Sequence, residues 1–185
     1  AVGNSCNPAF MEIGKRLGKD KFYEYFEAFG LMEHTGIDLP GEASLKGAIW
    51  AKEKMGEVEL ATASFGQRFE VTPLQMICAF SAVINGGDLV KPYIVQSVSS
   101  RDGTVLQNTE PEVVRQVISQ QTSQRAADIL EKVVSDGTGG NAYVAGYRIG
   151  GKTGSSEVKQ EEDHTIVSFM GYAPADDPQV IVLLA

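Results

Sequence analysis

Three strand-like segments joined by short polar connections close the sequence, and they restrict the folds that are open to it. The first holds Gly150 to Ser156, the second runs from Ile166 to Ala173, and the third starts at Gln179. Parallel strands need a crossover of a dozen or more residues between them, and these connections are shorter. We therefore expect a three-stranded antiparallel sheet at the C-terminal end with helices before it, an α/β (α+β) fold class.

Helical periodicity dominates the residues before the sheet. Apolar side chains recur at helical spacing in 8–17, and an aromatic stripe follows Asp20, which we expect to cap the second helix. Thr72 and Pro73 predict the start of a further, buried helix. Phe10, Ile13 and Leu17 share one face of the first helix. The residues expected to face the core are the aromatic stripe Phe22, Tyr23, Phe26 and Phe29 in the second helix, and Ala126, Ile129, Leu130 and Val133 in a helix over 121–134.

A hairpin pattern lies between the helical segments. Residues 92–99 alternate like a strand, Arg101 to Thr104 have the composition of a tight turn, and Val105 begins the return strand. The chain therefore divides into a helical part (about 1–90), small strands (about 92–118), and a helix with a sheet (about 121–185). We expect these parts to form a single, incomplete domain.

The composition suits a globular domain and excludes several functions. Of the 185 residues, 43% are hydrophobic and 22% are charged, which are ordinary proportions. The net charge of −8, with no Lys/Arg block, argues against binding of nucleic acid. No apolar run is long enough to span a bilayer. Neither Cys6 and Cys78 nor the two histidines have the spacing of a metal site, so we expect no metal and no cofactor.

The segment from Gly150 to Ser156 has the composition of an anion site. Its glycines let another backbone approach closely, and Lys152 brings a positive charge. Hydroxyl donors complete the segment at Thr153, Ser155 and Ser156. An acidic ligand is therefore expected against it.

The same letters also match a phosphate-binding pattern. Gly146 to Thr153 fit G-x-x-x-x-G-K-[ST], the P-loop, which needs a strand before it and a helix directly after it. Residues 139–145 do not have the pattern of a buried strand, and Gly154 with two serines does not favour a first helical turn. A P-loop is therefore disfavoured by its surroundings, although it stays open as an alternative.

A Lys-Thr-Gly segment also occurs in serine acyl-transferases that bind penicillin, on an edge strand that lines the acyl site. The partner motif of such a site is present here. Ser5-Cys6-Asn7 is a Ser-x-Asn, and Pro8 after it opens a helical run, so the motif can lie on a loop at a helix start. Ser5 and Asn7 could instead simply cap that helix.

Further motifs occur in the order found in one family. They are Ser5-Cys6-Asn7-Pro8, then Ser64 to Gln67 with Val71 to Gln75, then Gly137 to Gly139 with Tyr143 to Gly154, and finally Ser168 to Pro174. With these motifs the chain resembles the C-terminal part of the transpeptidase domain of class B penicillin-binding proteins, and within them the division and sporulation types. The resemblance implies a partial penicillin-binding/serine β-lactamase-like fold.

The resemblance also implies an activity and roles for named residues. The activity is D,D-transpeptidation, in which a serine attacks the D-Ala-D-Ala stem peptide, forms an acyl-enzyme and passes the acyl group to an amine. Lys152 with the hydroxyls of Thr153 and Ser155 would hold the substrate carboxylate, and the N–H of Ser155 would supply part of an oxyanion hole. Ser5 would relay a proton and Asn7 would bind the substrate amide. Gly154 and Ser156 would complete the substrate-binding strand.

One motif of the family departs from this match. The Ser-x-x-Lys that carries the nucleophile precedes Ser-x-Asn in the family, and neither Ser44-Leu45-Lys46 nor Ser119 to Thr122 supplies it. We therefore expect the nucleophile to lie before Ala1, the chain to be a piece of a larger domain, and the piece alone to be unable to form an acyl-enzyme.

Several alternatives remain beside this reading. They are a β-lactamase or a penicillin-sensing receptor of the same fold, a non-catalytic interaction module, and the P-loop protein. Glu57 to Leu60 are weakly similar to the stretch that holds the deacylating carboxylate of class A β-lactamases, with Ala61 where that pattern has Asn.

The resemblance finally implies partners and a location for the parent protein. The partners are peptidoglycan stem peptides, β-lactam antibiotics and the cell-wall synthesis machinery. The domain would lie on the extracytoplasmic face of the bacterial membrane, held by a single N-terminal anchor.

Overall fold

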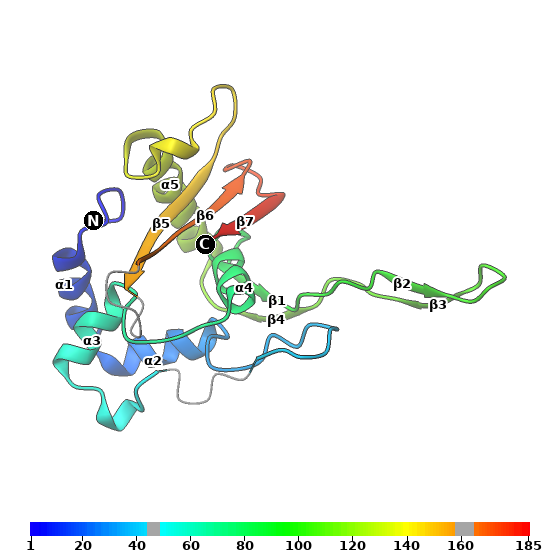
Figure 1. Cartoon of the computed structure of the whole chain (residues 1–185), viewed down its shortest axis with the longest axis horizontal. Coiled ribbons are helices and arrows are strands. Elements are labelled where there is room, and N and C mark those ends of the chain that lie inside the picture. Colours follow the sequence, from blue (N-terminus) through cyan, green and yellow to red (C-terminus); the bar gives the residue numbers. More distant parts are fainter. Residues whose placement is uncertain (44–48, 158–164) are drawn as a thin grey trace.

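The computed structural model describes residues 1–43, 49–157 and 165–185. Figure 1 shows helices at one end, a small sheet beside two of them, and a long two-stranded arm. The helices are α1 (Asn7–Leu17), α2 (Lys19–Ala28), α3 (Glu57–Ser64), α4 (Pro73–Ile84) and α5 (Gln120–Asp136), with short 3-10 turns at Lys52–Lys54 and Gly140–Ala142. The strands are β1 (Asp88–Val90), β2 (Ser97–Ser99), β3 (Val105–Asn108), β4 (Val113–Gln116), β5 (Gly150–Glu157), β6 (Thr165–Ala173) and β7 (Val180–Leu184).

The sheet predicted at the C-terminal end is confirmed. Its strands are antiparallel in the order β5-β6-β7, so β5, which carries Lys152, is an edge strand. Glycines allow the close pairing of β5 with β6. A Cβ on Gly150 would overlap the ring of Tyr172, and one on Gly154 would lie 2.7 Å from Ser168 Oγ. The glycines of β5 are therefore needed for the packing of the sheet as well as for any ligand.

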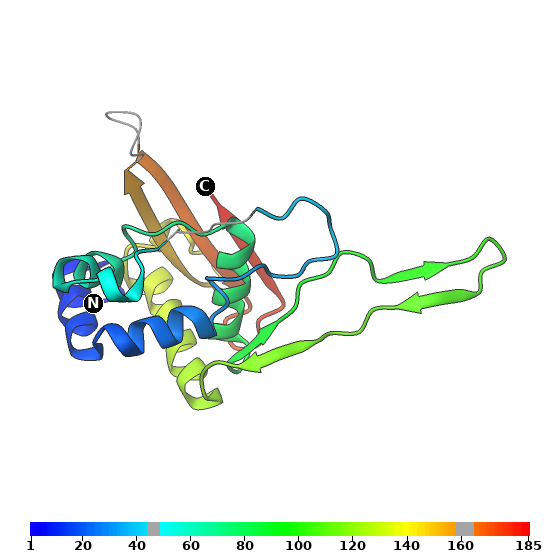
Figure 2. The same cartoon turned by 90° about the horizontal axis from the view of Figure 1, so that it is seen from below.

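The main core lies between the sheet and helices α4 and α5, which Figure 2 shows packed side by side against it. Tyr172 of β6 is 2% exposed and packs with Ile84 and Leu130. Its hydroxyl donates to the carbonyl of Ala127 at 3.1 Å, and burial raises the pKa of Tyr172 to about 12. One aromatic side chain of the central strand thus joins the sheet to α5.

Two helical expectations need correction. Asp20 does not cap α2, whose N-cap is Gly18; it lies in the first turn and pairs with Lys52 at 2.9 Å. In α5 the buried face includes Leu130 and Val133, as predicted, but Ile129 is 46% exposed. A periodic pattern predicts the existence of a helix more reliably than it predicts which residues at the border of the apolar face are buried. The burial of those residues depends on the elements that pack against the helix.

The start of α4 is confirmed in detail. Thr72 is its N-cap and accepts a hydrogen bond from the N–H of Gln75 at 3.1 Å, while the Gln75 side chain accepts one from Thr72 N at 2.9 Å. This reciprocal pair is a capping box followed by Pro73 at the first helical position. The aromatic stripe is also confirmed, since Tyr23 and Phe26 are buried.

Helix α3 was not predicted, and it explains a stretch that had been compared with β-lactamases. Glu59 lies in its first turn and accepts a hydrogen bond from Gly56 N at 3.0 Å. That carboxylate therefore caps a helix. Helix α3 also crosses α1 at close range. A Cβ on Gly14 of α1 would overlap Ser64 Oγ of α3, so the crossing depends on the absence of a side chain at Gly14.

The hairpin forms an arm that projects from the body (Figures 1 and 2). Its strands β2 and β3 are shorter than the predicted 92–99 strand, and all their residues are exposed. At the base of the arm, the two oxygens of Asp38 accept hydrogen bonds from Ile94 N and Val95 N, both at 2.8 Å. Strand β1, which the sequence did not predict, pairs with β4 and closes the arm against α4.

Among the described residues, no helix is both long and apolar enough to cross a membrane.

Candidate active site

The loop before α1 and the edge strand β5 meet at a serine and a lysine. The Nζ of Lys152 donates a hydrogen bond to the Oγ of Ser5 at 2.9 Å, across 147 residues of sequence. A second bond goes from the same Nζ to the carbonyl of Thr153 at 2.8 Å. These two contacts hold the ammonium group beside the edge of the sheet, where β5 has no neighbouring strand among the described residues.

The loop presents Ser5 through an unusual backbone conformation. Ser5 has a φ of 47°, in the left-handed region, where non-glycine residues are uncommon. Two turn hydrogen bonds hold it there, from Ser5 N to Val2 O and from Cys6 N to Ala1 O, both at 3.1 Å. Strained residues of this kind concentrate at functional sites, because the surrounding structure must maintain them.

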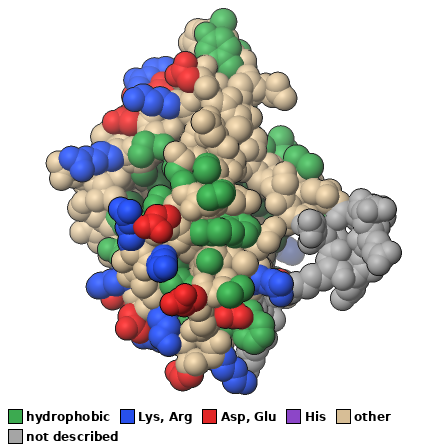
Figure 3. Space-filling model, turned by 90° about the vertical axis from the view of Figure 1, so that its left-hand side faces the viewer, with side chains coloured by type: hydrophobic (Ala, Val, Ile, Leu, Met, Phe, Trp, Pro, Cys, Tyr) green, Lys and Arg blue, Asp and Glu red, His purple; other side chains and the backbone are tan. Residues whose placement is uncertain are grey.

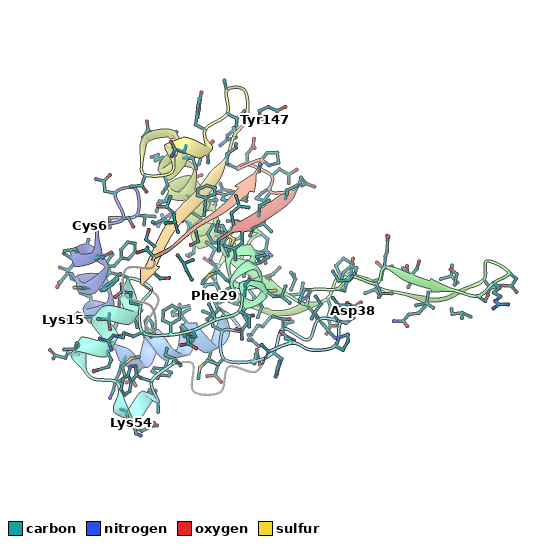
Figure 4. All side chains as sticks on the ribbon, viewed as in Figure 1. Cys6, Lys15, Phe29, Asp38, Lys54 and Tyr147 are labelled. Atoms are coloured by element: carbon teal, nitrogen blue, oxygen red, sulfur yellow. The ribbon has the colours of Figure 1, made fainter. Side chains whose placement is uncertain are left out.

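The possibility that Ser5 and Asn7 merely cap the first helix is wrong. The N-cap of α1 is Cys6, which is labelled in Figure 4, and its side chain makes no capping hydrogen bond. Asn7 is the first residue of the helix and is exposed, as is Ser5 two residues before it. Both polar side chains of the Ser-x-Asn are thus free of a capping role.

The environment of Lys152 favours its neutral form more than water does. Partial burial lowers the pKa of Lys152 from its ordinary value of 10.5 by desolvation. The site thus places a partly desolvated lysine in hydrogen-bond contact with the hydroxyl of Ser5.

The remaining predicted residues lie along β5 but do not all converge. Successive side chains of a strand point to opposite faces, so Thr153 and Ser155 share one face and Gly154 and Ser156 share the other with Lys152. Ser155 and Ser156 are exposed. In the described part of the chain, the hydrogen bonds bring together Ser5, Lys152 and Thr153, whereas Gly154, Ser155 and Ser156 extend the same edge.

Thr138 is a residue at this site to which the sequence assigned no role. Its hydroxyl lies 3.4 Å from the hydroxyl of Thr153, and its backbone N–H donates to the carbonyl of Gly3 at 3.0 Å. Gly137 to Gly139 had been noted only as part of a motif. A contact that joins three separate segments leaves no periodic signal in the sequence.

The P-loop alternative is wrong. Strand β5 runs from Gly150 to Glu157, so Thr153 lies within a strand and no helix N-terminus follows the Lys-Thr pair. Backbone N–H groups at such a terminus are what a P-loop uses to bind phosphate.

The Ser-x-x-Lys expectation also needs a correction. These letters do occur once, from Ser156 to Lys159, and were overlooked. Ser156 lies in an extended strand rather than in a helix, where a spacing of three brings side chains to one face. Lys159 lies outside the described residues, as do Ser44-Leu45-Lys46.

Comparison with known proteins agrees with the geometry. The sequence pattern of the family described as "Penicillin binding protein transpeptidase domain" matches residues 1–185. Stage V sporulation protein D of Bacillus subtilis (strain 168) is 46% identical over 189 residues, which cover 100% of this chain and 29% of that protein. Penicillin-binding protein PbpB of Mycolicibacterium smegmatis is 34% identical, over 97% of this chain and 29% of that protein.

Solved structures agree as well. Penicillin-binding protein 3 from Mycobacterium tuberculosis, in complex with aztreonam, matches with a TM-score of 0.89 at 30% identity over 98% of this chain and 43% of that one. The D,D-transpeptidase domain of a peptidoglycan glycosyltransferase from Eggerthella lenta matches with a TM-score of 0.86 at 30% identity, over 99% and 46% of the two chains. The chain spans about 29% of the length of these curated relatives. With a family pattern that matches it from end to end and a Ser-x-Asn serine in contact with an edge-strand lysine, this chain belongs to the penicillin-binding protein transpeptidase family.

Proposed function

We propose that this chain forms the Ser-x-Asn and Lys-Thr-Gly part of a single transpeptidase domain in a serine D,D-transpeptidase that cross-links peptidoglycan stem peptides. The observation that carries the proposal is the 2.9 Å contact between Lys152 and Ser5 at the free edge of β5. It is supported by relatives that are named peptidoglycan D,D-transpeptidases, such as PbpA of Mycolicibacterium smegmatis at 32% identity.

Capture of the donor peptide would use the edge strand. The donor ends in D-Ala-D-Ala, whose terminal carboxylate would lie at the free edge of β5. The Lys152 ammonium group folds back to the Thr153 carbonyl, so at that edge it could donate to the carboxylate together with the hydroxyls of Thr153 and Ser155, which start from the other face of the strand. An extended peptide can add to the edge of a sheet through main-chain hydrogen bonds, and β5 is an edge strand. Gly154 and Ser156 would lie along this edge, and Asn7 would bind the peptide amide.

Acyl transfer would then proceed on a serine supplied by the rest of the domain. Its hydroxyl oxygen attacks the penultimate D-Ala carbonyl and gives up its proton to the lysine of the same Ser-x-x-Lys motif, while the N–H of Ser155 stabilises the oxyanion. The terminal D-Ala leaves as an amine, and Ser5 passes it a proton that Lys152 replaces through their hydrogen bond. An amine of a second stem peptide attacks the acyl-enzyme and reverses the proton path.

β-Lactams carry a carboxylate beside an acylating carbonyl, so they would bind at the same edge of β5. The related penicillin-binding protein 3 from M. tuberculosis has been solved with aztreonam and with ampicillin. We expect penicillins to acylate the intact domain of this protein. We also expect the domain to act on the extracytoplasmic face of the membrane, through an N-terminal anchor and with the cell-wall synthesis machinery.

The 185-residue chain by itself is expected to be inactive. The serine to which Lys152 donates a hydrogen bond is Ser5, whose proposed task is to relay a proton. No serine and lysine spaced three apart lie on a described helix, which is the arrangement that the nucleophile needs.

The test is the intact mass of two proteins after incubation with a fluorescent penicillin. One is this chain, and the other is a longer polypeptide that contains it, here called the full-length protein. Addition of one adduct to the full-length protein alone supports the proposal. An adduct on the 185-residue chain would disprove its inactivity, and the absence of an adduct on both would count against the transpeptidase function.

A further inference from the structure

Thr138 contacts both segments that carry the proposed site. It follows the C-terminal end of α5, and its backbone N–H donates to Gly3 O in the loop that presents Ser5. Its hydroxyl lies 3.4 Å from that of Thr153 on β5. The backbones are packed closely at this point, since a Cβ on Gly137 would lie only 2.6 Å from Gly3 O. The position of Thr138 is thereby set from both sides.

The paired hydroxyls restrict where each proton can point. A threonine hydroxyl has one proton to donate and two lone pairs that accept. When Thr138 donates to the oxygen of Thr153, the proton of Thr153 is left for another acceptor. Hydrogen bonds in such a chain polarise one another, so a hydroxyl that accepts a bond donates a stronger one.

We propose that Thr138 is a positioning residue for the substrate carboxylate: it donates to Thr153 and so directs the Thr153 hydroxyl proton toward the anion held by Lys152. This inference rests on the proposed function and extends it to a residue outside the Lys-Thr-Gly strand. Thr138 does not itself touch the reacting atoms, and its effect is specific for ligands that carry a negative charge at that position.

The structure separates this role from a structural one. Thr138 is exposed, so its hydroxyl contributes little to the core. The hydrogen bond to Gly3 uses the backbone N–H, which every substitution except proline retains. Removal of the hydroxyl alone therefore leaves the loop in place.

The experiment measures the second-order rate constant of acylation of the full-length protein by benzylpenicillin and by its methyl ester. Thr138→Val keeps the shape and removes the hydroxyl, Thr138→Ser keeps the hydroxyl, and Thr109→Val on the arm is the matched control. We expect Thr138→Val to lower the rate with the carboxylate about five- to tenfold, the factor that one ordinary hydrogen bond supplies. Thr138→Ser and Thr109→Val should react with benzylpenicillin at the wild-type rate. With the methyl ester, all variants should be acylated at the same rate as the wild type.

A double variant tests the route through Thr153. If Thr138 acts only by orienting Thr153, then Thr138→Val has no further effect once Thr153→Val has removed the second hydroxyl. Additive losses in the double variant would overturn the proposal.

The other outcomes are equally decisive. If penicillin acylates the wild-type protein and the Thr138→Val variant at the same rate, the role of Thr138 is refuted and the proposed function stands. An equal loss with penicillin and its ester, or a loss that Thr138→Ser does not restore, shows a merely structural role and also refutes it. A wild-type protein that no penicillin acylates contradicts the proposed function and this inference together.

Discussion

At the residue scale, the site depends on a lysine whose charge is held in a partly desolvated place. Lys152 reaches Ser5 Oγ at 2.9 Å and Thr153 O at 2.8 Å, neither of which carries a charge that would stabilise the ammonium group. Burial consequently lowers its pKa. A bound carboxylate would supply the missing charge, in agreement with the proposed capture of the donor peptide.

The first prediction concerns this lysine. In the full-length protein, Lys152→Ala should lower the acylation rate with benzylpenicillin about 10- to 100-fold, since a charged hydrogen bond contributes about 1.5–3 kcal/mol. Lys15→Ala, on the exposed side of α1 in Figure 4, is the control and should have no effect. An unchanged rate in the Lys152 variant would exclude it from the site.

The second prediction is the pH dependence of that rate. A lysine pKa below 10.5 means that the ammonium form is lost at a lower pH than for an ordinary lysine. Capture of the carboxylate should therefore decline on the alkaline side before pH 10.5. Arginine stays protonated throughout, so Lys152→Arg should shift the alkaline limb to higher pH even where the rate itself is lower. The rate profiles of the two proteins test this, and coincident alkaline limbs would contradict it.

At the scale of elements, close contacts between helices and the docking of the arm are set by single residues. Gly14 lets α1 cross α3 against Ser64, and Asp38 ties the base of the arm to the loop after α2 (Figure 4). All residues of strands β2 and β3 are exposed, so these strands contribute no buried side chain to the core. An isolated two-stranded hairpin is marginal in water, so the position of the arm depends on its base.

The third prediction is that Gly14→Ala destabilises the crossing of α1 and α3. The new Cβ would overlap Ser64 Oγ and lie 2.6 Å from Ser64 Cβ. Overpacking of this kind costs about 1–3 kcal/mol in the free energy of unfolding, measured by denaturant titration. Gly3→Ala is the control, because nothing lies within 4 Å of its added Cβ. Equal stability of the two variants would show that the helices move apart freely.

The fourth prediction concerns Asp38. Its pKa is lowered by the backbone hydrogen bonds of Ile94 and Val95, so this stabilisation is present above the ordinary value of 3.8 and is lost as the pH falls through the lowered pKa. Asn has one acceptor oxygen in place of two. Asp38→Asn at neutral pH should therefore speed hydrogen exchange of these two amides about tenfold, whereas Asp177→Asn should not. Protection that stays equal in both variants would mean that other contacts hold the arm.

At the scale of the whole molecule, the chain exposes more surface than its mass requires. Its accessible surface is 12105 Å², compared with about 8,700 Å² for a compact monomer of this size. Figure 3 shows apolar side chains gathered in the middle of one face with charged groups of both signs around them. The side chains of Val180, Val182 and Leu184 on β7 are exposed as well. Apolar side chains that gather on one face are typical of surfaces that contact other proteins.

The fifth prediction is that Arg115 holds two distant parts of the molecule together. From β4 it donates to the carbonyls of Ala28 at 2.7 Å and Glu27 at 3.1 Å, at the end of α2, and it also pairs with Glu33. Arg115→Ala removes the side-chain donor to the Ala28 carbonyl and one of the two donors to the Glu27 carbonyl, which also accepts from Gly30 N. We expect this loss to cost about 1–3 kcal/mol in the free energy of unfolding. Arg101→Ala at the tip of the arm is the control. Equal stability of the Arg115→Ala and Arg101→Ala variants in a thermal or denaturant titration would disprove this role of Arg115.

The sequence by itself determined the features that depend on neighbouring residues and on connection lengths. Thr72 followed by Pro73 marked the start of α4, the short connections predicted that β5, β6 and β7 are antiparallel, and the motifs indicated the family. Each of these follows from backbone geometry within a few residues.

Only the tertiary structure decided which distant groups meet. Ser5 and Lys152 are 147 residues apart, and Thr138 reaches both of their segments. The same holds for Gly14 beside Ser64 and for Ile129, which faces solvent although its spacing favoured the core. Such contacts arise from the packing of whole elements, which a local pattern does not encode, because periodicity describes one helix or strand and not the surface against which it packs.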